Sequence, residues 1–242
     1  MHSKHFQFIL FFAFLSGITA SCHKDTGPTG PRLVKSMNIE GSSCQINCLY
    51  DDENRVTSVT QCDTVESYSY YDDSIVYVRT VGGGSPTRYI YAINDKGIAT
   101  SGIKVASDGS VTNYTYTYDA NNDRIQTTDN TNPNTFVTYT IENNNVVQDS
   151  SVSSLLGAGN YTISRIYYAN TDNTIGYANF GKTFLGSSSA NFKKAESYNT
   201  QAGQYTINYF YELDHLNGVS RRIMKTNDSI IESREYEYYG SD

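Results

Sequence analysis

The chain contains 242 residues, with 18 Lys or Arg against 25 Asp or Glu, which gives a net charge of −7 at pH 7. Binding a nucleic-acid backbone requires clustered basic residues, and an acidic chain without a basic stripe lacks them. We therefore expect no nucleic-acid partner.

The N-terminal segment has the three parts of a secretory signal. Lys4 supplies a positive charge, residues 6–15 (FQFILFFAFL) form a short apolar run, and residues 16–22 (SGITASC) are small and polar. Because the apolar run is too short to cross a hydrocarbon core of roughly 30 Å, we expect cleavage after Ser21. Cleavage leaves 221 residues with a net charge of −8, since the signal contains Lys4 and no acidic residue.

This segment resembles the lipoprotein signals of Gram-negative bacteria, in which the residue after the cleavage site is an acylated cysteine. Cys22 has that position, although Thr19 stands where Leu is usual. The resemblance implies a protein held on the bacterial outer membrane, at its periplasmic or cell-surface face, by acyl chains on Cys22. Such chains anchor a protein without any transmembrane helix. Ordinary cleavage and secretion is the alternative.

Residues 22–37 are predicted to be a lipidated, flexible tether, because Gly, Pro and polar residues dominate residues 23–36 (HKDTGPTGPRLVKS). The predicted organisation is a signal peptide at 1–21, this tether, and a single all-β domain at 38–242.

Three cysteines lie in the body of the chain. A hairpin around residues 51–54 would place Cys44 nearly opposite Cys62, so these two are the candidate disulfide. Cys48 is then left over, and its role stays open. No metal site is expected, because His215 is the only histidine beyond the tether.

From about residue 40 onward, β-rich runs alternate with turn clusters. In the clearest unit, residues 113–126 (NYTYTYDANNDRIQ), three tyrosines alternate with Thr115 and Thr117 and so occupy one face of a strand. Asp119 can hold the turn with its side chain, and Asn122 tolerates a left-handed φ. Similar turns at 51–54, 72–73, 94–97, 142–145, 170–173 and 214–218 predict about fourteen strands. Residues 170–197 interrupt the alternation of strands and turns, which predicts a long loop or irregular excursion there.

Residues 116–125 (YTYDANNDRI) resemble the tyrosine-aspartate repeat of bacterial surface proteins, with Asn122 in place of the usual Gly. With the signal, tether and decaying repeats, residues 40–242 are similar to a family of Gram-negative lipoprotein domains of unknown function described as porin-like. That family has been regarded as lipid-binding, so the resemblance implies a lipid-like ligand.

An antiparallel sheet with one apolar face must cover it, and the sequence offers no amphipathic helix. We therefore expect the meander to form a closed or nearly closed barrel. The other strand faces are polar, which predicts a water-exposed barrel; they include Ser67, Ser69, Thr115, Thr117, Glu235 and Glu237. Because about eight strands already enclose all the space that side chains can fill, fourteen would leave a cavity.

The chain contains 22 tyrosines, and each ring supplies apolar area together with a hydroxyl that needs a hydrogen-bond partner when it is buried. These rings either form the core or line a ligand cavity. The candidates for ligand binding, taken from the most regular strands, are Tyr89, Tyr91, Tyr114, Tyr116, Tyr118, Tyr209 and Tyr211.

No nucleophile elbow is present, and the acidic residues cluster in turns, so we expect neither an enzyme nor a cofactor. The leading interpretation is non-enzymatic binding of a hydrophobic or amphipathic ligand. A structural scaffold or adhesin that contacts proteins or glycans is the alternative.

Overall fold

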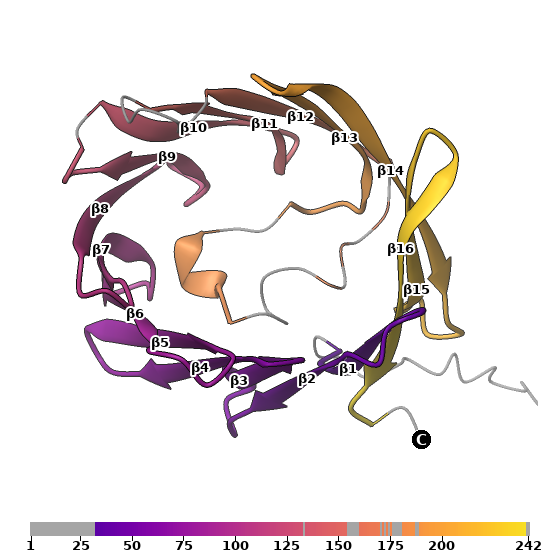
Figure 1. The fold of residues 1–242 in the computed structure, drawn as a ribbon, viewed down its shortest axis with the longest axis horizontal. Helices are drawn as coiled ribbons and strands as arrows, with labels where there is room; N and C mark the ends of the chain where they lie inside the picture. The colour runs from indigo at the N-terminus through magenta and orange to yellow at the C-terminus, as the bar shows by residue number, and fades with distance from the viewer. Residues whose placement is uncertain are drawn as a thin grey trace, which may run out of the picture.

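The computed structural model describes residues 32–132, 134–153, 160–169, 171, 173, 175, 181–186 and 189–240. These residues form a closed antiparallel barrel in which each strand pairs with the next and β1 pairs with β16 (Figure 1). The predicted all-β meander is confirmed. The predicted signal at 1–21, the lipidation site Cys22 and tether residues 22–31 lie outside the described residues.

The strands are β1 (Val34–Ile39), β2 (Gln45–Tyr50), β3 (Val56–Gln61), β4 (Thr64–Tyr70), β5 (Ser74–Val81), β6 (Thr87–Ile93), β7 (Ala99–Val105), β8 (Val111–Tyr118), β9 (Arg124–Asp129), β10 (Thr135–Glu142), β11 (Asn145–Val152), β12 (Tyr161–Tyr167), β13 (Lys193–Thr200), β14 (Gly203–Leu213), β15 (Val219–Thr226) and β16 (Ser229–Tyr238). A short 3-10 helix, η2, spans Thr183–Leu185.

The barrel has sixteen strands rather than the predicted fourteen. The seven predicted hairpins account for β2 to β15, and β1 and β16 flank them. Residues 34–37 were predicted to belong to the tether, yet they lie in β1, where Val34 and Met37 are fully buried. The pairing of β1 with β16 shifts register between Val34 and Ser36, so the apolar residues do not alternate and the strand pattern is hidden in the sequence.

All even-numbered strands finish at one end of the barrel, here called the even end, and the opposite end is the odd end. Four turns at the even end share one hydrogen-bond pattern. The Oδ1 atom of the first residue accepts the backbone N–H groups two and four positions ahead, and the residue three positions ahead has a positive φ. The turns begin at Asp51, Asn94, Asp119 and Asp214, and their left-handed residues are Asn54, Gly97, Asn122 and Asn217.

Tyrosines at the ends of four even-numbered strands connect these strands to their predecessors. Each hydroxyl donates a hydrogen bond to a backbone carbonyl at or next to the start of the preceding strand. The pairs are Tyr50 with Val34 (2.9 Å), Tyr70 with Val56 (2.8 Å), Tyr167 with Val146 (2.7 Å) and Tyr238 with Val219 (3.0 Å). The repeated tyrosine before a turn is therefore a structural feature of the even end.

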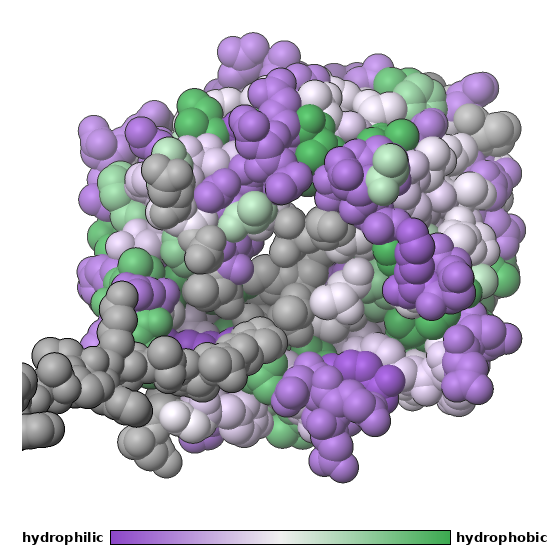
Figure 2. All heavy atoms as spheres, turned by 180° about the vertical axis from the view of Figure 1, so that it is seen from behind, coloured by the Kyte–Doolittle hydropathy of each residue, from purple (hydrophilic) through white to green (hydrophobic). Residues whose placement is uncertain are grey.

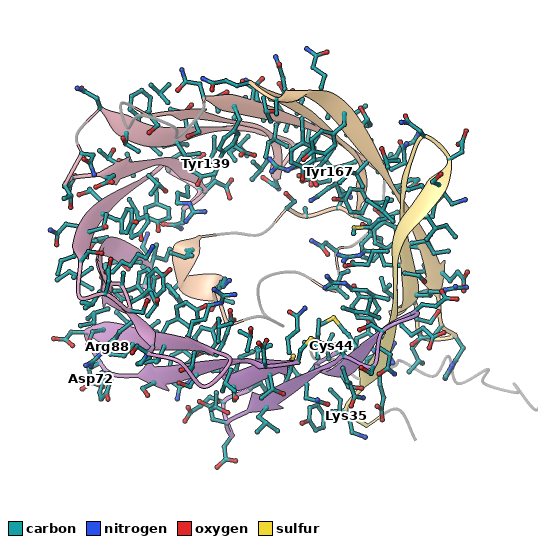
Figure 3. The ribbon with its side chains drawn as sticks, in the orientation of Figure 1. Lys35, Cys44, Asp72, Arg88, Tyr139 and Tyr167 are labelled. Atoms are coloured by element: carbon teal, nitrogen blue, oxygen red, sulfur yellow. A yellow bond between two sulfur atoms is a disulfide. The ribbon has the colours of Figure 1, made fainter. Side chains whose placement is uncertain are left out.

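The two faces of the strands differ in character. Figure 3 shows Tyr139 and Tyr167 pointing into the barrel and Lys35 and Arg88 pointing away from it. In β8, burial alternates residue by residue, with the three tyrosines on the lumen side and Thr115 and Thr117 outside. Figure 2 shows hydrophilic residues over much of one end of the barrel, with hydrophobic residues scattered between them.

A disulfide joins Cys44 and Cys62 at the odd end, with their Cα atoms 5.0 Å apart. It connects the start of β2 to the end of β3, as the hairpin geometry predicted. The third cysteine, Cys48, is buried on β2, and burial raises the pKa of its thiol to about 11.

Replacing both bridged cysteines, C44S/C62S, should lower the free energy of unfolding by about 3 kcal/mol, because the disulfide closes a loop with a sequence separation of 18. Urea denaturation measures this loss. A reducing agent serves as the matched control, since it should destabilise the wild type by the same amount and leave the double variant unchanged. Equal stability of wild type and variant would show that the crosslink contributes nothing.

Candidate functional site

Between β12 and β13 the structure describes residues 168–169, 171, 173, 175, 181–186 and 189–192, which are here called the luminal connection and which follow β12 at the even end. Figure 1 shows its helix η2 inside the ring of strands. The predicted irregular excursion is thus largely this segment, although it ends at Phe192, because β13 begins at Lys193. The described part around η2 therefore belongs to the barrel interior.

Hydrogen bonds hold the C-terminal part of the luminal connection to the β10–β11 turn. Asn145 donates to the Asn191 side chain (2.8 Å) and accepts from the Asn191 backbone (3.0 Å), while the Ala190 N–H donates to the Asn144 carbonyl (3.0 Å). The side chains of Asn145 and Asn191 thus satisfy each other in a part-buried position.

The region around η2 packs on tyrosines of the barrel wall. Phe184 is buried, and its ring centroid lies 4.6 Å from that of Tyr91. Gly181 lies directly against the Tyr68 ring, where a Cβ atom would approach within 2.9 Å. Only a residue without a side chain permits this contact, so the glycine lets the backbone reach the wall.

All seven candidate tyrosines face the lumen, but they do not form one site. Tyr89 and Tyr91 on β6 lie with the β8 tyrosines on one arc of the wall, and Tyr209 and Tyr211 on β14 lie across the barrel (Figure 1). A chain of ring contacts at centroid distances of 5.0 to 6.2 Å runs through Tyr68, Tyr77, Tyr89, Tyr91 and Tyr116.

Much of this tyrosine surface already has a partner inside the protein. Phe184 packs on Tyr91, Gly186 lies against the Tyr118 ring, and Phe192 stacks on Tyr211 at 4.7 Å. These contacts favour the core interpretation for these rings over ligand binding. Whether the seven candidates contact a ligand stays a prediction.

A buried charge cluster occupies the lumen side of β11 to β14. Arg165 forms ion pairs with Asp149 and with Glu196 (2.7 Å), and Lys193 contacts the same Glu196 oxygen at 2.5 Å. The Tyr209 hydroxyl also donates to Glu196. Burial alone would raise the pKa of Glu196, but Lys193, Tyr209 and Arg165 outweigh it and lower that pKa to about 2.

A cavity of about 380 Å³ remains inside the barrel near the odd end, and we call it the luminal cavity. Met37, Ile46 and Val59 form an apolar wall. Charged side chains come from the β3–β4 turn, from β4, β5 and β16, and from the luminal connection. The complete lining is Met37, Ile46, Val59, Gln61, Cys62, Asp63, Thr64, Glu66, Arg79, Lys182 and Arg234. The size lies within the range of small-molecule sites, roughly 300 to 1,000 Å³.

These lining residues were not predicted from the sequence, although part of the signal is present there. Glu66 comes two positions before Tyr68, Arg79 two after Tyr77, and Arg234 two before Tyr236. A side-chain period of two therefore places each of them on the same lumen face as its tyrosine. No such periodicity predicts the position of Lys182, because this residue belongs to the luminal connection and not to a strand.

The described residues contain no helix long and apolar enough to span a bilayer. Within the same part of the chain, no three His, Cys, Asp or Glu side chains come together as a metal site.

No protein-family model and no curated protein matches this chain. Among solved structures, it is similar to a porin-like protein from Bacteroides uniformis ATCC 8492, with a TM-score of 0.61 and 17% identity over 87% of this chain and 98% of that one. A porin-like protein from Bacteroides vulgatus ATCC 8482 has a TM-score of 0.58 and 12% identity, over 86% and 99%. These likenesses establish a porin-like barrel fold.

The Glu196 cluster predicts a specific dependence of stability on pH. Because the folded pKa is about 2 and the ordinary value is 4.5, the contribution is fully present above pH 4.5 and is lost as the pH falls through 2. Glu196→Gln should cost about 3 kcal/mol at pH 7, and that cost should shrink towards zero near pH 2. Urea unfolding across this range measures it.

Glu235→Gln, on the outer face of β16, is the control and should follow the wild type. A Glu196→Gln cost that stays constant between pH 7 and pH 2.5 would contradict this description of the cluster.

Proposed function

We propose that the protein is a lipid-anchored barrel of the bacterial envelope that binds a small amphipathic molecule in its lumen without transforming it. The observation that carries the proposal is the luminal cavity, whose lining combines apolar side chains of β1, β2 and β3 with charged side chains from the neighbouring strands on both flanks and from the luminal connection. Such a lining suits a ligand that has both an apolar and a polar part.

The outer face supports a barrel that stands beside the membrane. A membrane-spanning barrel turns a continuous apolar band towards lipid. Exposed, outward positions here include Ser67 and Ser69 on β4, Thr115 and Thr117 on β8, and charged Glu237, which pairs with Lys35 at 2.6 Å. With this wall, attachment through acyl chains on Cys22 supplies the membrane contact that the strands do not.

The luminal acids support binding rather than chemistry. Asp149 and Glu196 are engaged by Arg165, and Glu232 accepts from both Arg222 (3.2 Å) and Arg234 (2.5 Å). Carboxylates held in this way serve the fold. A scaffold or adhesin would have an interior without room for a ligand. The luminal cavity therefore favours ligand binding over that alternative.

Replacing residues 1–22 with a signal that is cleaved completely should release the protein into the periplasm, because neither acyl chains nor an uncut signal then hold it. Fractionation of membranes and soluble extract measures the shift, with the full chain as control. If the exchanged protein remained in the membrane fraction after high-salt washing, the strands themselves would insert, and anchoring through Cys22 would be wrong as the sole attachment.

Ligand binding can be tested by filling the luminal cavity. The native full chain should release a bound amphipathic molecule on solvent extraction, detected by mass spectrometry. Ile46→Trp places a large side chain in the cavity and should reduce the amount recovered at least about tenfold. Leu49→Trp is the matched control, because Leu49 lies on the same strand with an outward side chain that is 55% exposed.

Recovery of equal amounts from both variants would contradict a luminal site. So would a wild-type protein that carries no ligand and binds no member of a panel of fatty acids, lysolipids and sterols. The thermal midpoint of each variant reports whether it is folded.

A further inference from the structure

The basic residues around the luminal cavity have more positive charge than the nearby acids neutralise. Arg234 contacts Glu232 through Nε (2.5 Å) and through its second terminal nitrogen (2.9 Å). Arg222 binds the same carboxylate at 3.2 Å, and its buried Nε has no hydrogen-bond partner among the described residues. Two guanidinium groups therefore share one carboxylate, which leaves a positive charge in excess.

Lys182 adds a second positive charge from the opposite side of the cavity. Its Nζ lies 5.9 Å from the centroid of the Tyr77 ring, and no ion pair joins it to an acid among the described residues. The contacts of Gly181 with Tyr68 and of Phe184 with Tyr91 fix the backbone on both sides of it. The luminal connection thus holds this cation at the edge of the cavity.

The acids of the cavity are less available to a ligand. Glu66 accepts hydrogen bonds from the hydroxyls of Tyr77 (2.7 Å) and Tyr68 (3.3 Å), and Arg79 lies 3.6 Å from it. Asp63 belongs to the exposed turn between β3 and β4, where water screens its charge. Among the described lining residues, a cationic ligand would therefore find only the water-screened carboxylate of Asp63, whereas an anion would find Lys182 and Arg234.

We propose that the ligand of the luminal cavity carries an oxyanion, a carboxylate or a phosphate, which binds between Lys182 and Arg234. Its apolar chain lies against Met37, Ile46 and Val59. This inference rests on the proposed function and adds the charge of the ligand and the residues that recognise it. Charge-assisted hydrogen bonds from Lys and Arg are the ordinary means of binding such groups.

The test compares ligands that share one tail and differ in the head group. The mature chain exported with the exchanged signal retains all sixteen strands and is titrated by calorimetry with octanoate, octyl phosphate, octanol and octylamine. We expect the two anions to bind at least about tenfold more tightly than octanol, and octylamine more weakly than octanol. Acetate and inorganic phosphate, which lack the tail, should bind much more weakly than their octyl counterparts.

Two variants locate the head group. Lys182→Met and Arg234→Met should each weaken octanoate binding about tenfold and leave octanol binding unchanged, which also shows that the variants are folded. Lys104→Met is the matched control: Lys104 faces Tyr89 on the lumen side of β7 but does not line the cavity, so both ligands should bind as before.

The outcomes separate this inference from the proposed function. If octanol bound as tightly as octanoate, or if Lys182→Met left octanoate binding intact, the anionic head group would be wrong while a luminal ligand site would stand. Acetate binding as tight as that of octanoate would overturn the tail contact. If no octyl compound bound at all, the proposed function would fail with it.

Discussion

Pairing of β1 with β16 is the interaction on which the rest of the structure depends, because it closes sixteen strands into a barrel without free edges. A barrel of about eight strands is filled by its own side chains, and one of sixteen is too wide for that. Closure therefore creates an interior that the chain must fill by other means. The luminal connection and the inward tyrosines meet this requirement.

The luminal connection fills the barrel interior from the even end, which explains why the interior is packed in one part and open in another. The luminal connection enters at the even end, where Asn144 and Asn145 hold it, and places Phe184 on the tyrosine wall. Near the odd end, Lys182 is the one described residue of this segment that lines the luminal cavity, and space remains. The same segment thus turns one part of the tyrosine wall into core and supplies a cation to the part left open.

Local periodicity allowed much of the fold to be predicted and only part of the site. The alternation in β8 and the Asp119 turn follow from residue types alone, because side chains of a strand alternate and Asp and Asn stabilise tight turns. The register shift in β1 hides its pattern. The position of Lys182 depends on how an aperiodic segment folds inside a barrel, which no local rule predicts.

The central claim is that the closed barrel holds an anionic amphipathic ligand beside its luminal connection. A crystal structure of the mature chain with 8-bromooctanoate tests it most directly, since the bromine gives an anomalous peak. We expect this peak against Met37, Ile46 and Val59, with the carboxylate between Lys182 and Arg234. A peak on the outer wall, or a luminal connection lying outside the barrel, would contradict it.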